Sequence, residues 1–155
     1  ARYSEAGSDY VDNMERLRRK FETAKGLVPA PVLTPAAKPS RIGVIHYGST
    51  SPAMTEALHL LGRLGLHVDA LRVRGFPFAA AVDNFIEEHD TVFVVEQNES
   101  GQLRTLLINE GEHNPRKLLK VLHYDGSPIT ARFIAAAIEA ALATSEAPVP
   151  TTIHG

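Results

Sequence analysis

Apolar side chains recur along the first part of the chain at alternating steps of four and three residues. They are Tyr10, Met14, Leu17, Phe21, Ala24 and Val28, and charged residues occupy many of the positions between them. Positions three and four apart share one side of an α-helix, so this spacing predicts a single helix with a narrow apolar face. We call these six positions the N-terminal stripe.

From Arg41 onward, short apolar runs alternate with segments of helical spacing. The apolar runs predict strands at residues 42–46, 68–74, 92–95 and 120–124, and the other patterns predict helices over 54–64, 82–89, 103–107 and 129–142. The run 92–95 has no polar interruption, which is typical of an inner parallel strand covered on both faces. The alternation predicts the α/β class: a three-layer α/β/α sandwich with a mostly parallel sheet and right-handed crossovers.

Four prolines separate the predicted N-terminal helix from this pattern. We expect a connector helix over residues 1–26, a proline-rich linker over 27–40, the α/β domain over 41–144 and a flexible tail over 145–155. Two placements of the helix are equally consistent with the pattern: its stripe docks outside this chain, or the helix folds back onto the domain. The first methionine, Met14, lies inside the periodic segment, so we expect a piece of a longer polypeptide.

The composition excludes several classes of function. The 155 residues carry a net charge of −2, which gives no reason to expect nucleic acid or an anionic membrane as a partner. The chain has no cysteine, so it cannot supply thiolate ligands to an iron–sulfur cluster. No apolar run approaches the ~20 residues of a membrane span, and no apolar signal core is present. We therefore expect a soluble, cytoplasmic protein.

Two loops follow predicted strands at places where parallel sheets bind ligands. Residues 48–51 and 125–127 each precede a proline that can open a helix. Helix N-termini attract anions, so Ser49, Thr50 and Ser51 are candidate contacts for a small anionic ligand. The simpler interpretation is that Ser51 and Ser127 cap the following helices. We favour capping, because neither loop has the lysine of a phosphate-binding loop or the glycines of a dinucleotide site.

A second polar cluster follows the predicted strand 92–95. Glu96, Gln97 and Asn98 stand at the carboxyl end of this strand, where they could contact a ligand or a neighbouring domain. A solvated loop in which Asn98 or Ser100 caps the next helix explains the same residues equally well.

Other polar residues give no catalytic set. The seven histidines lack a metal-binding spacing, and we expect structural hydrogen bonds from His46 and His123, which end two predicted strands. Arg72 and Arg74 share one face of a predicted strand, which favours an edge strand with solvated arginines over an anion site.

Several motifs together resemble a known family. The run VDALRVRGFPFAAAVDNFIEEHDTVFVVEQNESGQLRTLL resembles the transketolase-like C-terminal domain. With GVIHYGSTSPAMTEAL, VLHYDGSPITARFI and the segment NMERLRRKFETA, it resembles the C-terminal part of the alpha subunit of 2-oxoacid:ferredoxin oxidoreductases, of the 2-oxoglutarate type. The resemblance covers nearly the whole chain.

This resemblance implies an enzyme of several modules. Such enzymes decarboxylate a 2-oxoacid on thiamine diphosphate, pass electrons through iron–sulfur clusters to ferredoxin, and transfer the acyl group to coenzyme A. The family's thiamine diphosphate and magnesium motif is absent, because Asp125-Gly126 follows Tyr124 and not glycine. The resemblance therefore implies no catalytic, cofactor-binding or metal residue in this chain, and a fragment that is inactive alone.

The implied role is support and assembly. The partners would be the remaining alpha-subunit domains and the beta subunit, with ferredoxin reached through the complex. Glu96, Gln97, Asn98 and Arg104 would face a neighbouring module, and the N-terminal stripe would dock on the upstream domain or a partner subunit. The alternative is a self-standing α/β domain that binds a small anion at the loop from Ser49 to Ser51.

Overall fold

A computed structural model of the chain describes residues 3–145, within which five strands form one sheet in the order β1-β3-β2-β4-β5. The strands are β1 Val32–Thr34, β2 Ile42–Tyr47, β3 Asp69–Val73, β4 Thr91–Glu96 and β5 Leu118–Leu122. The helices are α1 Gly7–Lys25, α2 Ser51–Arg63, α3 Ala80–Glu88, α4 Gln102–Gly111 and α5 Ala131–Ser145, with a 3-10 turn at Gly48–Thr50. The predicted tail, apart from Ser145, lies outside the described residues.

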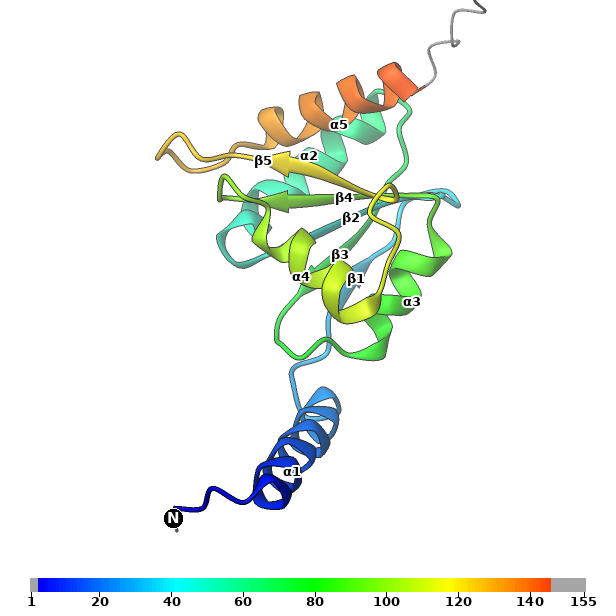
Figure 1. The fold of residues 1–155 in the computed structure, drawn as a ribbon. Coiled ribbons are helices and arrows are strands. Elements are labelled where there is room, and N and C mark those ends of the chain that lie inside the picture. Colours follow the sequence, from blue (N-terminus) through cyan, green and yellow to red (C-terminus); the bar gives the residue numbers. More distant parts are fainter. Residues whose placement is uncertain (1–2, 146–155) are drawn as a thin grey trace, which may run out of the picture.

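Helices cover both faces of the sheet, as predicted. α2 and α5 pack on one face and α3 and α4 on the other, and Figure 1 shows the sheet between the two pairs. Side chains of β4 alternate between the two cores: Phe93 and Val95 belong to one, Val92 and Val94 to the other. All four are fully buried, which agrees with an inner strand whose two parallel neighbours are β2 and β5. The predicted three-layer α/β sandwich is confirmed.

The sheet includes a strand that the sequence pattern did not predict. β1 lies within the segment expected to be a linker and pairs antiparallel with β3, with Leu33 opposite Leu71. Two further contacts hold this segment: the Ala36 amide donates to Asp69 Oδ1 over 2.6 Å, and the Ser40 hydroxyl donates to the carbonyl of His67 over 2.5 Å. Residues 32–40 are therefore attached to the α/β domain.

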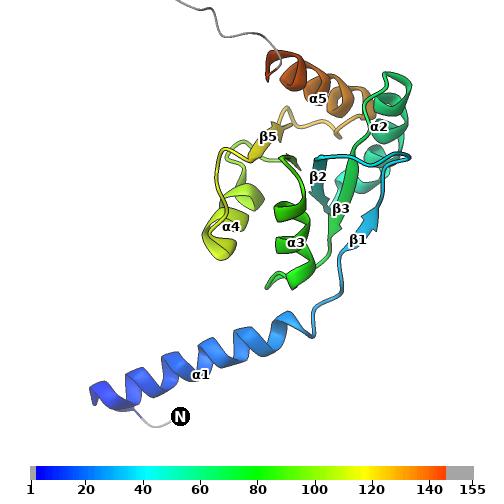
Figure 2. The ribbon, with the colours of Figure 1, turned by 90° about the vertical axis from the view of Figure 1, so that its right-hand side faces the viewer.

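Helix α1 projects from the α/β domain. In Figures 1 and 2 it extends away from the sheet, and it contains no buried residue. Its C-terminal end touches the domain, where the Phe21 and Phe76 rings lie edge to face with centroids 6.4 Å apart. Val28, just beyond the helix, lies beside Gly75, where an added Cβ atom would come within 3.1 Å of the Val28 Cβ. Four positions of the N-terminal stripe stay exposed, namely Tyr10, Met14, Leu17 and Phe21.

Candidate functional site

Three loops at the carboxyl ends of the parallel strands are joined by one side chain, Gln97. Its Nε2 donates to Ser49 Oγ over 2.9 Å and lies 3.3 Å from Thr50 Oγ1. Its Oε1 accepts a hydrogen bond from the Ile129 amide over 3.4 Å. Ser49, Thr50 and Gln97, which the sequence predicted in two separate clusters, therefore lie together in one cluster that we call the Gln97 bridge.

The Gln97 bridge lies where ligands bind in many open parallel sheets. Those ligands sit between adjacent strand ends whose following helices lie on opposite faces. β2 and β4 are such a pair, because α2 and α4 pack in different cores. Here the two loops are tied directly by side-chain hydrogen bonds, so the Ser49 and Thr50 hydroxyls already have protein partners.

Glu96 points into the protein and caps helix α4. The carboxylate is fully buried. Its Oε2 accepts hydrogen bonds from the Leu103 amide at 2.7 Å and from Asn98 Nδ2 at 2.8 Å, and its Oε1 accepts from the Arg104 amide at 3.0 Å. These amides belong to the first helical turn, whose N–H groups have no partner within the helix and favour negative charge. In this fold, Glu96 is not available to a neighbouring module.

Asn98 and Arg104 complete the same local structure. Asn98 Oδ1 accepts from the amides of Gly101 at 2.7 Å and Gln102 at 3.2 Å. The N-cap residue of α4 is Gly101 and not Asn98 or Ser100, so Asn98 holds the start of the helix from outside the predicted cap position. The Arg104 guanidinium donates to the carbonyl oxygens of Leu118 at 2.6 Å and Pro115 at 2.7 Å. These two hydrogen bonds fix the segment that leads into β5.

The predicted serine caps are wrong. Ser51 is the first residue of α2, and its hydroxyl donates backward to the Gly48 carbonyl over 2.9 Å, since a 3-10 turn precedes the helix. Ser127 lies four residues before α5 and donates to Asp125 Oδ1 over 2.7 Å. The cap of α5 is Thr130, whose Oγ1 accepts from the Phe133 amide over 3.2 Å.

The histidines that end β2 and follow β5 differ in their surroundings. His46 is buried, and its Nδ1 lies 3.5 Å from Ser51 Oγ. Burial and the nearby Arg72 charge lower the pKa of His46 to about 4. His123 is also buried; its Nε2 lies 3.5 Å from Asp125 Oδ1, while its Nδ1 has no hydrogen-bond partner among the described residues. The expected structural hydrogen bonds are thus weak for both rings.

Asp125 is tied into a local turn. Asp125 is the carboxylate nearest in sequence to the family's metal motif, but it accepts from the Ser127 amide at 2.8 Å and the Ser127 hydroxyl. These hydrogen bonds lower the pKa of Asp125. Between residues 3 and 145, no group of three histidine or acidic side chains could hold a metal ion.

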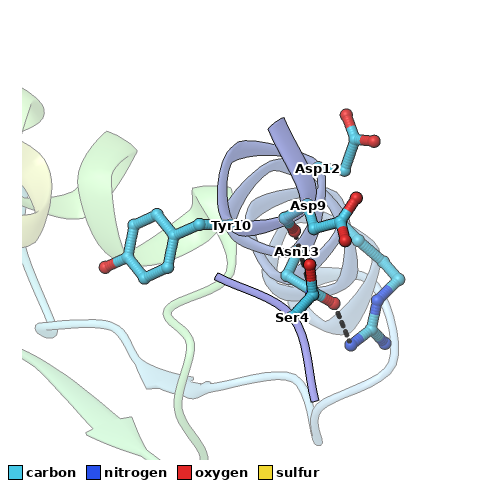
Figure 3. Close-up of a pocket in the computed structure, with 6 residues that line it drawn as sticks. Ser4, Asp9, Tyr10, Asp12 and Asn13 are labelled. Atoms are coloured by element: carbon cyan, nitrogen blue, oxygen red, sulfur yellow. Dashed lines mark hydrogen bonds between the residues drawn. The ribbon is translucent and has the colours of Figure 1, made fainter. Parts of the chain in front are cut away.

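Among the described residues, a shallow hollow on the surface of α1 also lacks a group of three histidine or acidic side chains that could hold a metal ion. Arg16 donates to Asn13 Oδ1 over 3.4 Å in this hollow. Its lining residues are Ser4, Asp9, Tyr10, Asp12, Asn13 and Arg16. Figure 3 shows that Tyr10 leaves the helix on the side opposite to Asp12. The hollow is an exposed helix surface, and Tyr10 lies at its boundary with the N-terminal stripe.

Comparisons with known proteins identify the fold. No family model and no curated protein matches the chain. A solved 2-oxoglutarate:ferredoxin oxidoreductase from Magnetococcus marinus, with 2-oxoglutarate, coenzyme A and succinyl-CoA bound, matches with a TM-score of 0.77 at 22% identity. That match covers 88% of this chain and 24% of the oxidoreductase chain.

A second solved structure, a split-gene transketolase described as an inactive beta4 tetramer, matches with a TM-score of 0.57 at 20% identity. This match covers 72% of this chain and 41% of the transketolase chain.

The chain is about a quarter as long as the oxidoreductase chain that it resembles, because the match to that chain covers 24% of it. None of the helices within residues 3–145 has the length and apolar character needed to cross a bilayer. The chain has the transketolase-like α/β fold found in the matched parts of both proteins.

Proposed function

We propose that this chain is the support and assembly domain at the C-terminal end of an alpha subunit in a 2-oxoglutarate:ferredoxin oxidoreductase. In the complete enzyme, a 2-oxoacid is oxidatively decarboxylated, its acyl group passes to coenzyme A, and electrons pass to ferredoxin. This chain braces the modules that carry out those steps. Its partners are the other alpha-subunit domains and the beta subunit.

The observation that carries this proposal is the extent of the fold match. The oxidoreductase match covers 88% of this chain. Residues 27–155 make up about 83% of the chain, so a match over 88% must also include a few residues before Leu27. The match to one chain of a larger enzyme thus extends over the α/β domain and some of the residues that precede it.

The exposed stripe on α1 supports an assembly role. Tyr10 is 69% exposed and Phe21 52%, although apolar side chains arranged on one helix face normally pack against another surface. The cationic side chains of Arg18 and Lys20 flank this face on its two sides at helical spacing, and neither forms an ion pair within the described residues. A partner surface with an apolar strip between carboxylates would fit this face.

The cofactors belong to other modules under this proposal. The chain has no cysteine for an iron–sulfur cluster, and Asp125 is held in a local turn with Ser127. The residues present therefore do not fit thiamine diphosphate with magnesium, and we assign no chemical step to this chain.

Isolation of the tagged chain from its native source tests the proposal. We expect the chain to co-purify with 2-oxoglutarate oxidation that depends on coenzyme A and reduces ferredoxin. The proposal fails if such activity separates completely from the chain.

A matched pair of variants tests the stripe. Leu17→Glu places a charge on the apolar face, whereas Arg19→Glu changes the opposite side of the helix. Leu17 is 40% exposed in the free chain, so docking would bury the rest of its side chain, and a glutamate there would place a charge against the apolar partner surface. We therefore expect at least ~10-fold weaker association for the first variant. Equal association of the two variants would exclude α1 as the docking element.

A further inference from the structure

A groove of about 320 Å³ lies between helix α2 and the edge of the sheet at β1 and β3. It is separate from the Gln97 bridge, because its sheet side consists of residues in β1, β2 and β3. One part of its wall is polar, with His46, Ser51 and Arg72, and the other part is apolar, with Val32, Met54, Leu58 and Ala70. Ligand pockets often combine an apolar wall with a few polar groups in this way.

The polar part contains an unbalanced positive charge. Arg72 is the neighbour of His46 on the adjacent parallel strand, and it forms no ion pair within the part of the chain that the structure describes. His46 is only 5% exposed, and burial together with Arg72 lowers its pKa to about 4. Among the residues that line the groove, Arg72 is the charged group that faces this ring, and there is no carboxylate.

His46 has unused hydrogen-bonding capacity. Its Nδ1 has one long contact, 3.5 Å to Ser51 Oγ, and no protein partner of Nε2 is found within residues 3–145. Nε2 is not among the buried side-chain atoms without a partner in the described residues, so it is accessible, and a polar ligand atom in the groove can form a hydrogen bond with it. The ring, the guanidinium and the Ser51 hydroxyl line the same groove.

We propose that this groove binds a small carboxylate that carries a short apolar chain. The carboxylate would accept hydrogen bonds from the Arg72 guanidinium and from His46, since arginine is suited to carboxylate recognition. The chain of the ligand would lie against Met54 and Leu58. A groove of 320 Å³ holds the volume of about ten waters at roughly 30 Å³ each, which limits the ligand to a small acid.

Butyrate provides the probe, and nuclear magnetic resonance of the histidine rings of the full chain provides the measurement. We expect butyrate to shift the His46 ring signals saturably and to raise the pKa of His46, because the bound anion offsets the Arg72 charge. Butyramide, a neutral analogue of similar shape, should bind at least ~10-fold more weakly, as should inorganic phosphate, which has no apolar chain.

Two variants localise the effect. Arg72→Gln should weaken butyrate binding at least ~10-fold and should raise the pKa of His46 in the absence of ligand. Arg74→Gln, two residues further along, removes an arginine outside the groove and should bind as the unchanged chain does.

Several results would overturn the proposal. These are the absence of a saturable shift with butyrate, an equal response to butyramide, a preference for phosphate, or unchanged binding after Arg72→Gln. The comparison of butyrate with butyramide uses the unsubstituted chain, so it decides the question even if a variant fails to fold.

Discussion

Replacement of Glu96 by glutamine tests whether this buried carboxylate is the cap that holds helix α4 on the sheet. Glutamine keeps the shape of the side chain but replaces one acceptor oxygen by an amide group that can only donate. If the amide group takes the place of Oε2, the Leu103 amide and the Asn98 side chain both lose their acceptor, which lies at 2.7 Å and 2.8 Å in the native chain. If it takes the place of Oε1, the Arg104 amide loses its acceptor at 3.0 Å.

The size of the effect follows from these contacts. An unsatisfied buried donor costs ~1–3 kcal/mol, and hydrogen bonds to charged groups contribute about 1.5–3 kcal/mol. We therefore expect Glu96→Gln to lower the free energy of unfolding by roughly 2–4 kcal/mol, which lowers the melting temperature by about 2–4 °C for each kcal/mol.

Urea denaturation of the variant, followed by circular dichroism, measures this loss. Glu99→Gln is the matched control, because Glu99 is exposed and lies in the same loop; its change should stay within ~0.5 kcal/mol. Amide hydrogen exchange should show faster exchange at Leu103 and Arg104. If Glu96→Gln is no less stable than the control, the capping role assigned to Glu96 is wrong.

Two further predictions concern packing and pH. Gly43→Ala would place a Cβ atom 2.7 Å from the Phe85 ring, so we expect a loss of ~1–3 kcal/mol in urea denaturation, whereas Gly62→Ala, in a helix with open space, should be neutral or stabilising. The second prediction uses the depressed pKa of His46. The unfolded state binds its proton near pH 6.5 and the folded state only near pH 4, so stability due to this group is complete above pH 6.5 and falls as the pH drops toward 4. Up to about 3 kcal/mol should be lost across that range, and a His46→Asn variant should show a smaller pH dependence; equal slopes would contradict the assigned cause.

The layers of the fold could be predicted from the sequence, because the faces that are buried in each layer must carry apolar residues. The run 92–95 is uniformly apolar because both faces of the strand are covered. Each helix that packs on the sheet has one apolar side, and the spacing of its apolar residues predicts it. β1 could not be predicted in this way. All three of its residues are exposed, so the sequence has no alternation of apolar and polar positions there, and the strand is defined by its pairing with β3.

The site residues show where reasoning from local sequence ends. A serine before a proline is a good cap signal, yet Ser51 and Ser127 are used in turns because the chain path, set by the sheet, begins the helices elsewhere. The Glu96 side chain points into the protein because the start of helix α4 lies over the end of β4 and donates an amide hydrogen bond to it, a contact that the local sequence does not reveal. The Gln97 bridge likewise joins residues that are 48 positions apart in the chain.

The short strand β1 limits how other chains can approach this sheet. It has three residues, Val32–Thr34, and prolines at positions 31 and 35 lack the N–H groups that a further strand would require. Lateral growth of the sheet beyond β1 is thereby discouraged, which protects the domain from edge-to-edge aggregation. Association on this side must rely on side chains and surface shape, and not on continued backbone pairing.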